Sequence, residues 1–360
     1  MAVPYVRPRV RSAADSVDFE RPYPAGWFDH LIDWIDRAPG PNVAYVIGLL
    51  VAEAVYITGL VWWNGKLPVG EVDLRRLFIA VVAPYLLWVR LHLDRVAGAA
   101  LDDFRPALAV DEGEFQRLRY ELTTLPLRTS RTVTAIAVVV FLANWGRAPM
   151  WLLDDYATSM ASALLFMGPI GLFTFAVAAL SIAQAVHQLQ TVQYLHDRAG
   201  TIRLFRTKPL YAFSHVAART GMSLLLLVYY VASVRPDVLL ASPPLRTLVL
   251  IMVLTAVACF VLPLRGMHRR IAAEKDHALA QTALRFEALT GRLHERIEAG
   301  DLGDADRLAM QLSSVVTERD ALNRVSTWPW ELPTITAFVT TMVLPAIVWV
   351  LQRVLTRIGL

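Results

Sequence analysis

One carboxylate stands out because it falls in the middle of an apolar stretch. Glu53 lies near the centre of residues 42–63, and a charged side chain at that depth in a bilayer is costly unless it is paired, protonated or hydrated. Two interpretations remain open: an ion or proton site, or a structural hydrogen bond or ion pair between helices. Arg219 is the candidate partner, and His215 lies one turn before it on the same helical face. Both cations could instead extend to the membrane surface, and we prefer that interpretation for His215.

Hydroxyl groups recur at the start of the last apolar stretch, residues 333–355. If this helix stood at the centre of an oligomer, Thr336 and Thr340 would line a narrow pore. The alternative is that these hydroxyls bond back to their own helix or help helices to pack. The four threonines are Thr334, Thr336, Thr340 and Thr341.

A Gly-Pro-Ile-Gly sequence at residues 168–171 interrupts another apolar stretch. Such a break exposes backbone carbonyls in some transporters. It more often produces a kink or a close helix crossing. Pro84 and Pro345 have the same two interpretations.

The usual enzyme and metal motifs are missing from the sequence. It contains no His-Glu-x-x-His, no Gly-rich phosphate loop, no Gly-x-Ser-x-Gly and no pair of cysteines, since Cys259 is the only one. Three histidines, His268, His277 and His294, are not spaced to stack on adjacent turns. We therefore expect no enzyme, no metal site and no cofactor.

The amino-acid composition indicates an integral membrane protein. Hydrophobic residues make up 56% of the 360 residues and charged residues 18%, against about 25% charged in soluble domains. Apolar stretches near the ~20 residues that cross a bilayer recur along the chain. We predict an all-α polytopic transmembrane bundle of about seven spans, the third of them interrupted at Asn144, Gly146, Arg147 and Pro149. The predicted spans are residues 42–63, 75–92, 133–153, 160–187, 209–234, 245–264 and 333–355.

Lysine and arginine gather in alternate loops, which predicts a cytoplasmic N-terminus and an outer C-terminus. The net charge is +4, but it is not clustered, so a nucleic-acid partner is not expected. The first forty residues lack the apolar core of a cleavable signal peptide. We expect a multi-pass protein of the plasma membrane whose main partner is the lipid bilayer.

The sequence divides into four parts. Residues 1–41 form a cytoplasmic segment with an interfacial helix, where Phe28 and Ile32 lie on a face opposite Asp29. Residues 42–264 form a six-span bundle with extended cytoplasmic helix ends, in which Asp111 begins a short amphipathic helix as its cap. Residues 265–330 form a coiled-coil-like helical hairpin and a joint, and residues 331–360 the final span. The hairpin is expected to join a compact cytoplasmic layer with the fourth and fifth helices.

The joint is a candidate gating element. Pro329 lies between Trp328 and Trp330, and proline ends a helix while indoles favour the depth of lipid headgroups. Pro345 follows inside the last span. The chain is therefore redirected into the membrane at this point.

The last hundred residues resemble a family of uncharacterised prokaryotic polytopic membrane proteins. The resemblance rests on Pro-Leu-Arg-Gly-Met-His at 263–268, the acidic hairpin turn, Ser-Thr-Trp-Pro-Trp at 326–330, Leu344-Pro345 and Trp349. It implies the membrane fold and no activity. In topology alone, the chain also resembles insect chemoreceptor channels.

The leading hypothesis is a homo-oligomeric, ion-channel-like protein gated through the cytoplasmic helical layer and the last span. The first alternative is a secondary transporter with Glu53 as its coupling site. The second is a membrane sensor or scaffold that transports nothing. The sequence does not identify the small ion or solute.

Overall fold

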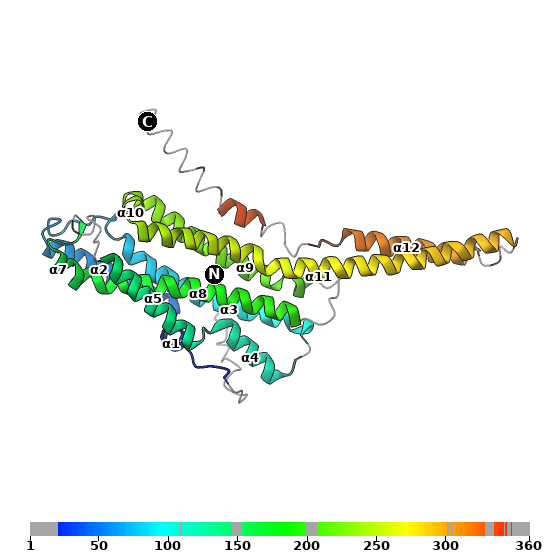
Figure 1. Ribbon diagram of the computed structural model, residues 1–360, viewed down its shortest axis with the longest axis horizontal. Helices are drawn as coiled ribbons and strands as arrows, with labels where there is room; N and C mark the ends of the chain where they lie inside the picture. The colour runs from blue at the N-terminus through cyan, green and yellow to red at the C-terminus, as the bar shows by residue number, and fades with distance from the viewer. Residues whose placement is uncertain are drawn as a thin grey trace, which may run out of the picture.

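The protein is all-helical in the part of the chain that the computed structural model describes (Figure 1). That part comprises residues 21–108, 110–145, 153, 155–198, 207–300, 303, 305–327, 335–341, 343 and 347. It holds no β-sheet, and its extended pairing is a single bridge between Ala25 and Pro126. The predicted fold class is confirmed at this level.

Four helical segments of the described chain are long and apolar enough to cross a membrane. An α-helix rises about 1.5 Å per residue, so roughly twenty residues cover the hydrocarbon core of a bilayer. The third of these segments contains most of α9 (Thr207–Val234), and the fourth is the first part of α11 (Pro243–Glu298). In chain order, the segments are α2 (Asn42–Trp63), Met160–His196, Phe213–Val234 and Leu245–Leu262.

Two further helices lie where spans were predicted but do not share this apolar character. α3 (Phe78–Phe104) carries Arg90, Asp94 and Arg95 near its middle, and α5 (Leu127–Trp145) has two arginines in its first turns. These charges lower the hydropathy of both helices. The predicted count of seven and the predicted orientation therefore stay predictions, and most of the last predicted span lies outside the described residues.

The second apolar segment has the local break that its glycines and proline predicted. After the short α7 (Met160–Ser162), Ala163–Met167 forms a π-helix, and α8 (Gly168–Arg198) begins directly after it. Pro169 has no backbone N–H to give to the preceding turn, which favours the wider π spacing there. The Phe166 carbonyl oxygen accepts a hydrogen bond from Tyr56 Oη of α2 at 3.0 Å.

α9 lies between α3 and α11, while α8 packs against α3, α5 and α11. At one end of the bundle, Phe104 and Phe213 pack with α4 (Glu112–Thr123) through Leu118 and Leu122. The short α10 (Pro236–Ala241) connects α9 to α11 at the other end. The 3-10 turn Arg105–Ala107 leads from α3 toward α4.

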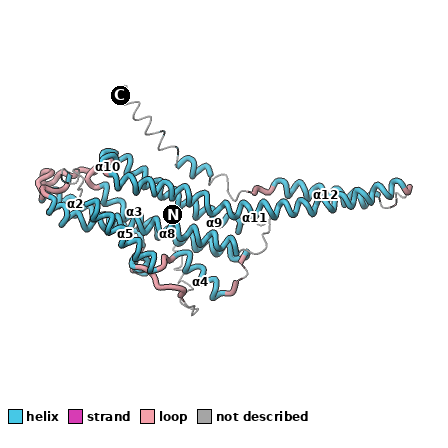
Figure 2. The backbone as a smooth tube through the Cα atoms, viewed as in Figure 1, coloured by secondary structure: helices cyan, strands magenta, loops and turns pink. Residues whose placement is uncertain are grey.

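The longest helix runs from the bundle into a projecting stem (Figures 1 and 2). α11 has 56 residues, and α12 (Ala305–Arg324) returns along it after Gly300, whose φ is 70°. Only the base of this stem joins the bundle core, where Ile271 and Leu322 pack with α8 and α9. The compact layer expected from the sequence differs from this arrangement, because beyond its base the hairpin packs α12 against α11, and its apolar stripe there is half-buried at Phe286, Leu289 and Leu293.

α1 (Trp27–Arg37) buries Phe28 and Ile32, as its apolar face predicted, and buries Asp29 with them. The assignment of Asp29 to a solvated face was wrong. Gly26 precedes the helix and lies so close to α5 that an added Cβ would stand 2.3 Å from Ser130 Oγ. α1 can dock here only because residue 26 has no side chain.

Gly26→Ala is expected to lower the stability of the detergent-solubilised protein by roughly 1–3 kcal/mol, the usual cost of overpacking. Thermal unfolding followed by circular dichroism measures the loss. Gly48→Ala in α2 is the control, since an added Cβ meets nothing within 4 Å there. Equal unfolding temperatures for the two variants would contradict the close docking of α1.

Candidate functional site

A buried arginine near the middle of α3 joins three separate parts of the chain. Arg90 of α3 is 4% exposed. Its Nη2 donates to Asp29 Oδ1 of α1 at 3.0 Å and to the Thr123 carbonyl oxygen, and its Nη1 donates to Asp94 Oδ1. The N–H of Leu125 adds a 3.3 Å hydrogen bond to Asp29 Oδ2.

The Arg90 cluster, formed by Asp29, Arg90 and Asp94, is a charged group held largely away from solvent. Burial raises the pKa of the Asp29 carboxyl, while the Arg90 guanidinium and the Leu125 N–H lower it. Desolvation of charges is expensive, so such a cluster contributes little net stability when intact and costs much when one member is lost.

Further hydrogen bonds near the Arg90 cluster connect the residues before α1, the end of α4 and α8. Tyr23 Oη donates to the Thr124 carbonyl oxygen, and Tyr120 Oη donates to the Tyr23 carbonyl oxygen, both at 2.9 Å. His187 Nε2 of α8 lies 2.9 Å from the Glu121 carbonyl oxygen. The segment before α1 is thereby fastened to the connection between α4 and α5.

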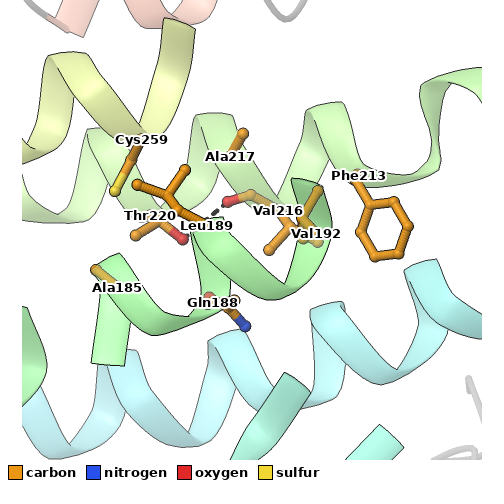
Figure 3. A pocket seen from close by; sticks show the side chains of 9 residues that line it. All are labelled: Ala185, Gln188, Leu189, Val192, Phe213, Val216, Ala217, Thr220 and Cys259. Carbon is orange, nitrogen blue, oxygen red and sulfur yellow. Dashed lines mark hydrogen bonds between the residues drawn. The ribbon is translucent and has the colours of Figure 1, made fainter. Parts of the chain in front are cut away.

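Beside Arg90, a cavity of about 30 Å³ opens between α3, α8 and α9. A second cavity, of about 10 Å³, lies between α8, α9 and α11 and reaches Cys259. Figure 3 shows the second cavity, with Cys259 on α11, Thr220 on α9, and Ala185 and Gln188 on α8. The polar side chains that line the first cavity are Arg90, Ser181, Gln184, Gln188 and Thr220.

Glu53 is buried, and the structure does not pair it with Arg219, the candidate partner. Glu53 is 7% exposed, and its Oε2 has no hydrogen-bond partner among the described residues. Arg219 is exposed on α9, forms no ion pair with Glu53, and lies near enough to His92 of α3 to influence that ring electrostatically. Within the described chain, Glu53 therefore forms no ion pair.

The described part of the last predicted span, residues 335–341, 343 and 347, is helical and turns two threonines outward. Thr336 and Thr340 are exposed, whereas Phe338 is 4% exposed and stacks on Phe260 of α11 with ring centroids 3.6 Å apart. An added Cβ at Gly221 would lie 2.8 Å from Phe338 Cε2. A small residue on α9 thus lets the ring fit between two helices.

The candidate gating joint lies outside the described residues, since Trp328, Pro329, Trp330 and Pro345 all do. The residues before it are described as far as Thr327. Lys275 Nζ of α11 donates to the carbonyl oxygens of Asn323 and Val325, each at 2.9 Å, so the end of α12 is fixed to the stem immediately before the joint.

Sequence reasoning missed the Arg90 cluster and the cavity beside it. Arg90 falls near the end of a predicted span, where an arginine usually extends to the membrane surface. The polar face of α8 could have been predicted from the sequence, because Gln184 and Gln188 are four residues apart and therefore lie on one face of a helix. Within the described chain, no group of His, Cys, Asp or Glu side chains could hold a metal ion.

Comparison with known protein families, curated proteins and solved structures finds no match to this chain. Its function must therefore be inferred from the arrangement of its own residues.

Arg90→Met is expected to destabilise the protein by about 3–5 kcal/mol, because it leaves Asp29 and Asp94 buried without their cation. Chemical unfolding of the detergent-solubilised protein measures the loss. Arg95→Met is the matched control on the same helix, since the Arg95–Asp36 pair has side chains 63% and 57% exposed and such pairs contribute about 0–1 kcal/mol. Similar losses for both variants would refute the central place of Arg90.

Proposed function

We propose that the protein is a homo-oligomeric channel of the plasma membrane in which the last helix of each copy lines the pathway. One observation carries the proposal. The described part of that helix docks on its own bundle through the Phe338 side and turns Thr336 and Thr340 away from it.

An outward face needs an occupant, and in a membrane that occupant is lipid or another copy of the chain. Val339 is 47% exposed and Val343 43% exposed, so hydroxyl and apolar side chains alternate around the outward face. Thr340 makes no hydrogen bond within the described chain, unlike Thr341, which bonds back to the Ala337 carbonyl oxygen at 2.8 Å. A ring of Thr340 hydroxyls around a shared axis would provide polar groups to a narrow pathway.

The contact between Phe338 and Phe260 also supports a gating route. Phe260 belongs to α11, which continues without interruption into the stem. At the base of the stem, Lys275 of α11 bonds to the end of α12, and His268 Nδ1 of α11 lies 3.0 Å from the Thr327 carbonyl oxygen after α12, so the two arms of the stem are held together there. A change in stem position would therefore reach the last helix through one stacked pair of rings.

Specific observations favour each of the two alternative functions. A secondary transporter is favoured by the unpaired Glu53 carboxylate and by the π-helix that Tyr56 contacts, because π-turns often mark functional sites. A sensor or scaffold is favoured by the projecting stem, which exposes Leu284 and Met310.

Cysteine substitution at the outward threonines tests the channel. Thr336→Cys and Thr340→Cys proteins in liposomes should conduct salt and lose at least about 80% of that flux after treatment with a cationic thiosulfonate, since a water-lined thiol ionises and reacts readily. Val55→Cys is the control, because Val55 is 67% exposed on α2 and would face lipid. Its flux should be unaffected, as should that of the native chain, whose Cys259 is buried.

Flux that the reagent leaves intact at both threonines would place the pathway elsewhere. A particle mass equal to one chain plus its detergent would exclude the oligomeric proposal. Absence of salt flux combined with solute uptake that Glu53→Gln abolishes would establish the transporter instead.

A further inference from the structure

Three of the residues that line the cavity between α3, α8 and α9 each carry a buried polar atom without a hydrogen-bond partner in the described chain. The three atoms are Arg90 Nε, Gln184 Oε1 and Gln188 Nε2. Each of the three residues is 4% exposed. Buried polar groups are nearly always satisfied in folded proteins, by protein atoms or by ordered water, so these three atoms indicate that the cavity takes a hydrogen-bonding occupant.

The occupant must accept hydrogen bonds from Arg90 and Gln188 and donate one to Gln184. Arg90 has committed its Nη1 and Nη2 atoms to Asp29, Asp94 and the Thr123 carbonyl oxygen, which leaves Nε for the cavity. Gln184 Nε2 points to the Leu122 carbonyl oxygen at 3.5 Å. Mixed donors and acceptors require a ligand that performs both roles.

Charge excludes simple ions as the occupant. One guanidinium lies between two carboxylates in the Arg90 cluster, so the cluster carries net negative charge when ionised and repels an anion. The guanidinium itself borders the cavity and repels a cation. A small neutral molecule remains.

Size reduces the choice to water. The first cavity, at about 30 Å³, accommodates two water molecules, and the second, at about 10 Å³, is near the least space that holds one. Both cavities are lined by Ala185, Gln188 and Thr220. Thr220 Oγ1 donates to the Val216 carbonyl oxygen at 2.9 Å and keeps its lone pairs for another donor.

We propose that the two cavities form one hydrated chamber, in which water bridges Arg90, Gln184 and Gln188 and passes the Gln188 side chain to reach Cys259. Water would complete the solvation of a buried arginine inside the bundle. It would also let α3, α8 and α9 move relative to one another, because hydrogen bonds through water can rearrange where direct hydrogen bonds would have to break. Such a chamber does not depend on the channel proposal.

The only cysteine of the chain provides the reporter. Cys259 is 1% exposed and lines the second cavity, and the infrared S–H band of a single thiol is unambiguous. On transfer of the full-length protein in nanodiscs to D₂O, the native S–H band should convert to S–D. Gln188→Leu should slow that conversion at least about tenfold, because the side chain that conducts water between the cavities becomes apolar.

Gln190→Leu is the matched control, since Gln190 lies on the same helix but is exposed, and its exchange rate should equal that of the native protein. If Gln188→Leu does not fold, Ala185→Val narrows the space that both cavities share and should slow exchange as well. A native thiol that resists exchange, or equal rates in the native protein and every folded cavity variant, would overturn the proposal.

Salt substitution separates water from ions. At constant ionic strength, replacing chloride by gluconate or sodium by N-methylglucamine should leave the unfolding temperature of the native protein unchanged. An unfolding temperature that falls when one ion is removed, and falls less in Gln188→Leu, would assign the cavity to that ion.

Discussion

The Arg90 guanidinium is the interaction on which the docking of α1 depends. It is bound by Asp29 from α1, by Asp94 from its own helix and by the Thr123 carbonyl oxygen before α5. These groups come together only when α1, α3 and the connection from α4 to α5 are all in place. A buried ion cluster of this kind gives little net stability but penalises every alternative arrangement, which makes the packing specific.

Arg90 belongs both to the Arg90 cluster and to the lining of the proposed hydrated chamber. Nη1 and Nη2 of the guanidinium are bonded to carboxylates and a carbonyl oxygen, whereas Nε has no partner in the described chain and the side chain lines the cavity. Ion pairs with carboxylates would hold α3 against α1. Water-mediated hydrogen bonds in the cavity would let the contact between α3 and α8 change. The closely packed junction of Phe338, Phe260 and Gly221 then fixes the last helix to the more distant α9 and α11.

Local patterns were sufficient to predict several elements. Period 3.6 predicted the buried Phe28 and Ile32 of α1, and the Asp111 side chain caps α4 by accepting from the Glu114 N–H at 2.7 Å. The partners of Arg90 could not be predicted from the sequence, because Asp29 is 61 residues away along the chain and no local spacing encodes that contact. The candidate pairing of Glu53 with Arg219 is absent from the described chain for a different reason, because depth in a span does not determine which way a side chain points around its helix.

The continuity of α11 gives the stem a mechanical meaning. Beyond Ile271, which packs in the bundle core, α11 runs to the turn at Gly300 over about 30 residues, or roughly 45 Å of helix at 1.5 Å per residue. A tilt of about 5° at Ile271 moves the tip by about 4 Å over that length. A small force on the tip therefore exerts a large torque at the base of the stem, from which α11 continues to Phe260.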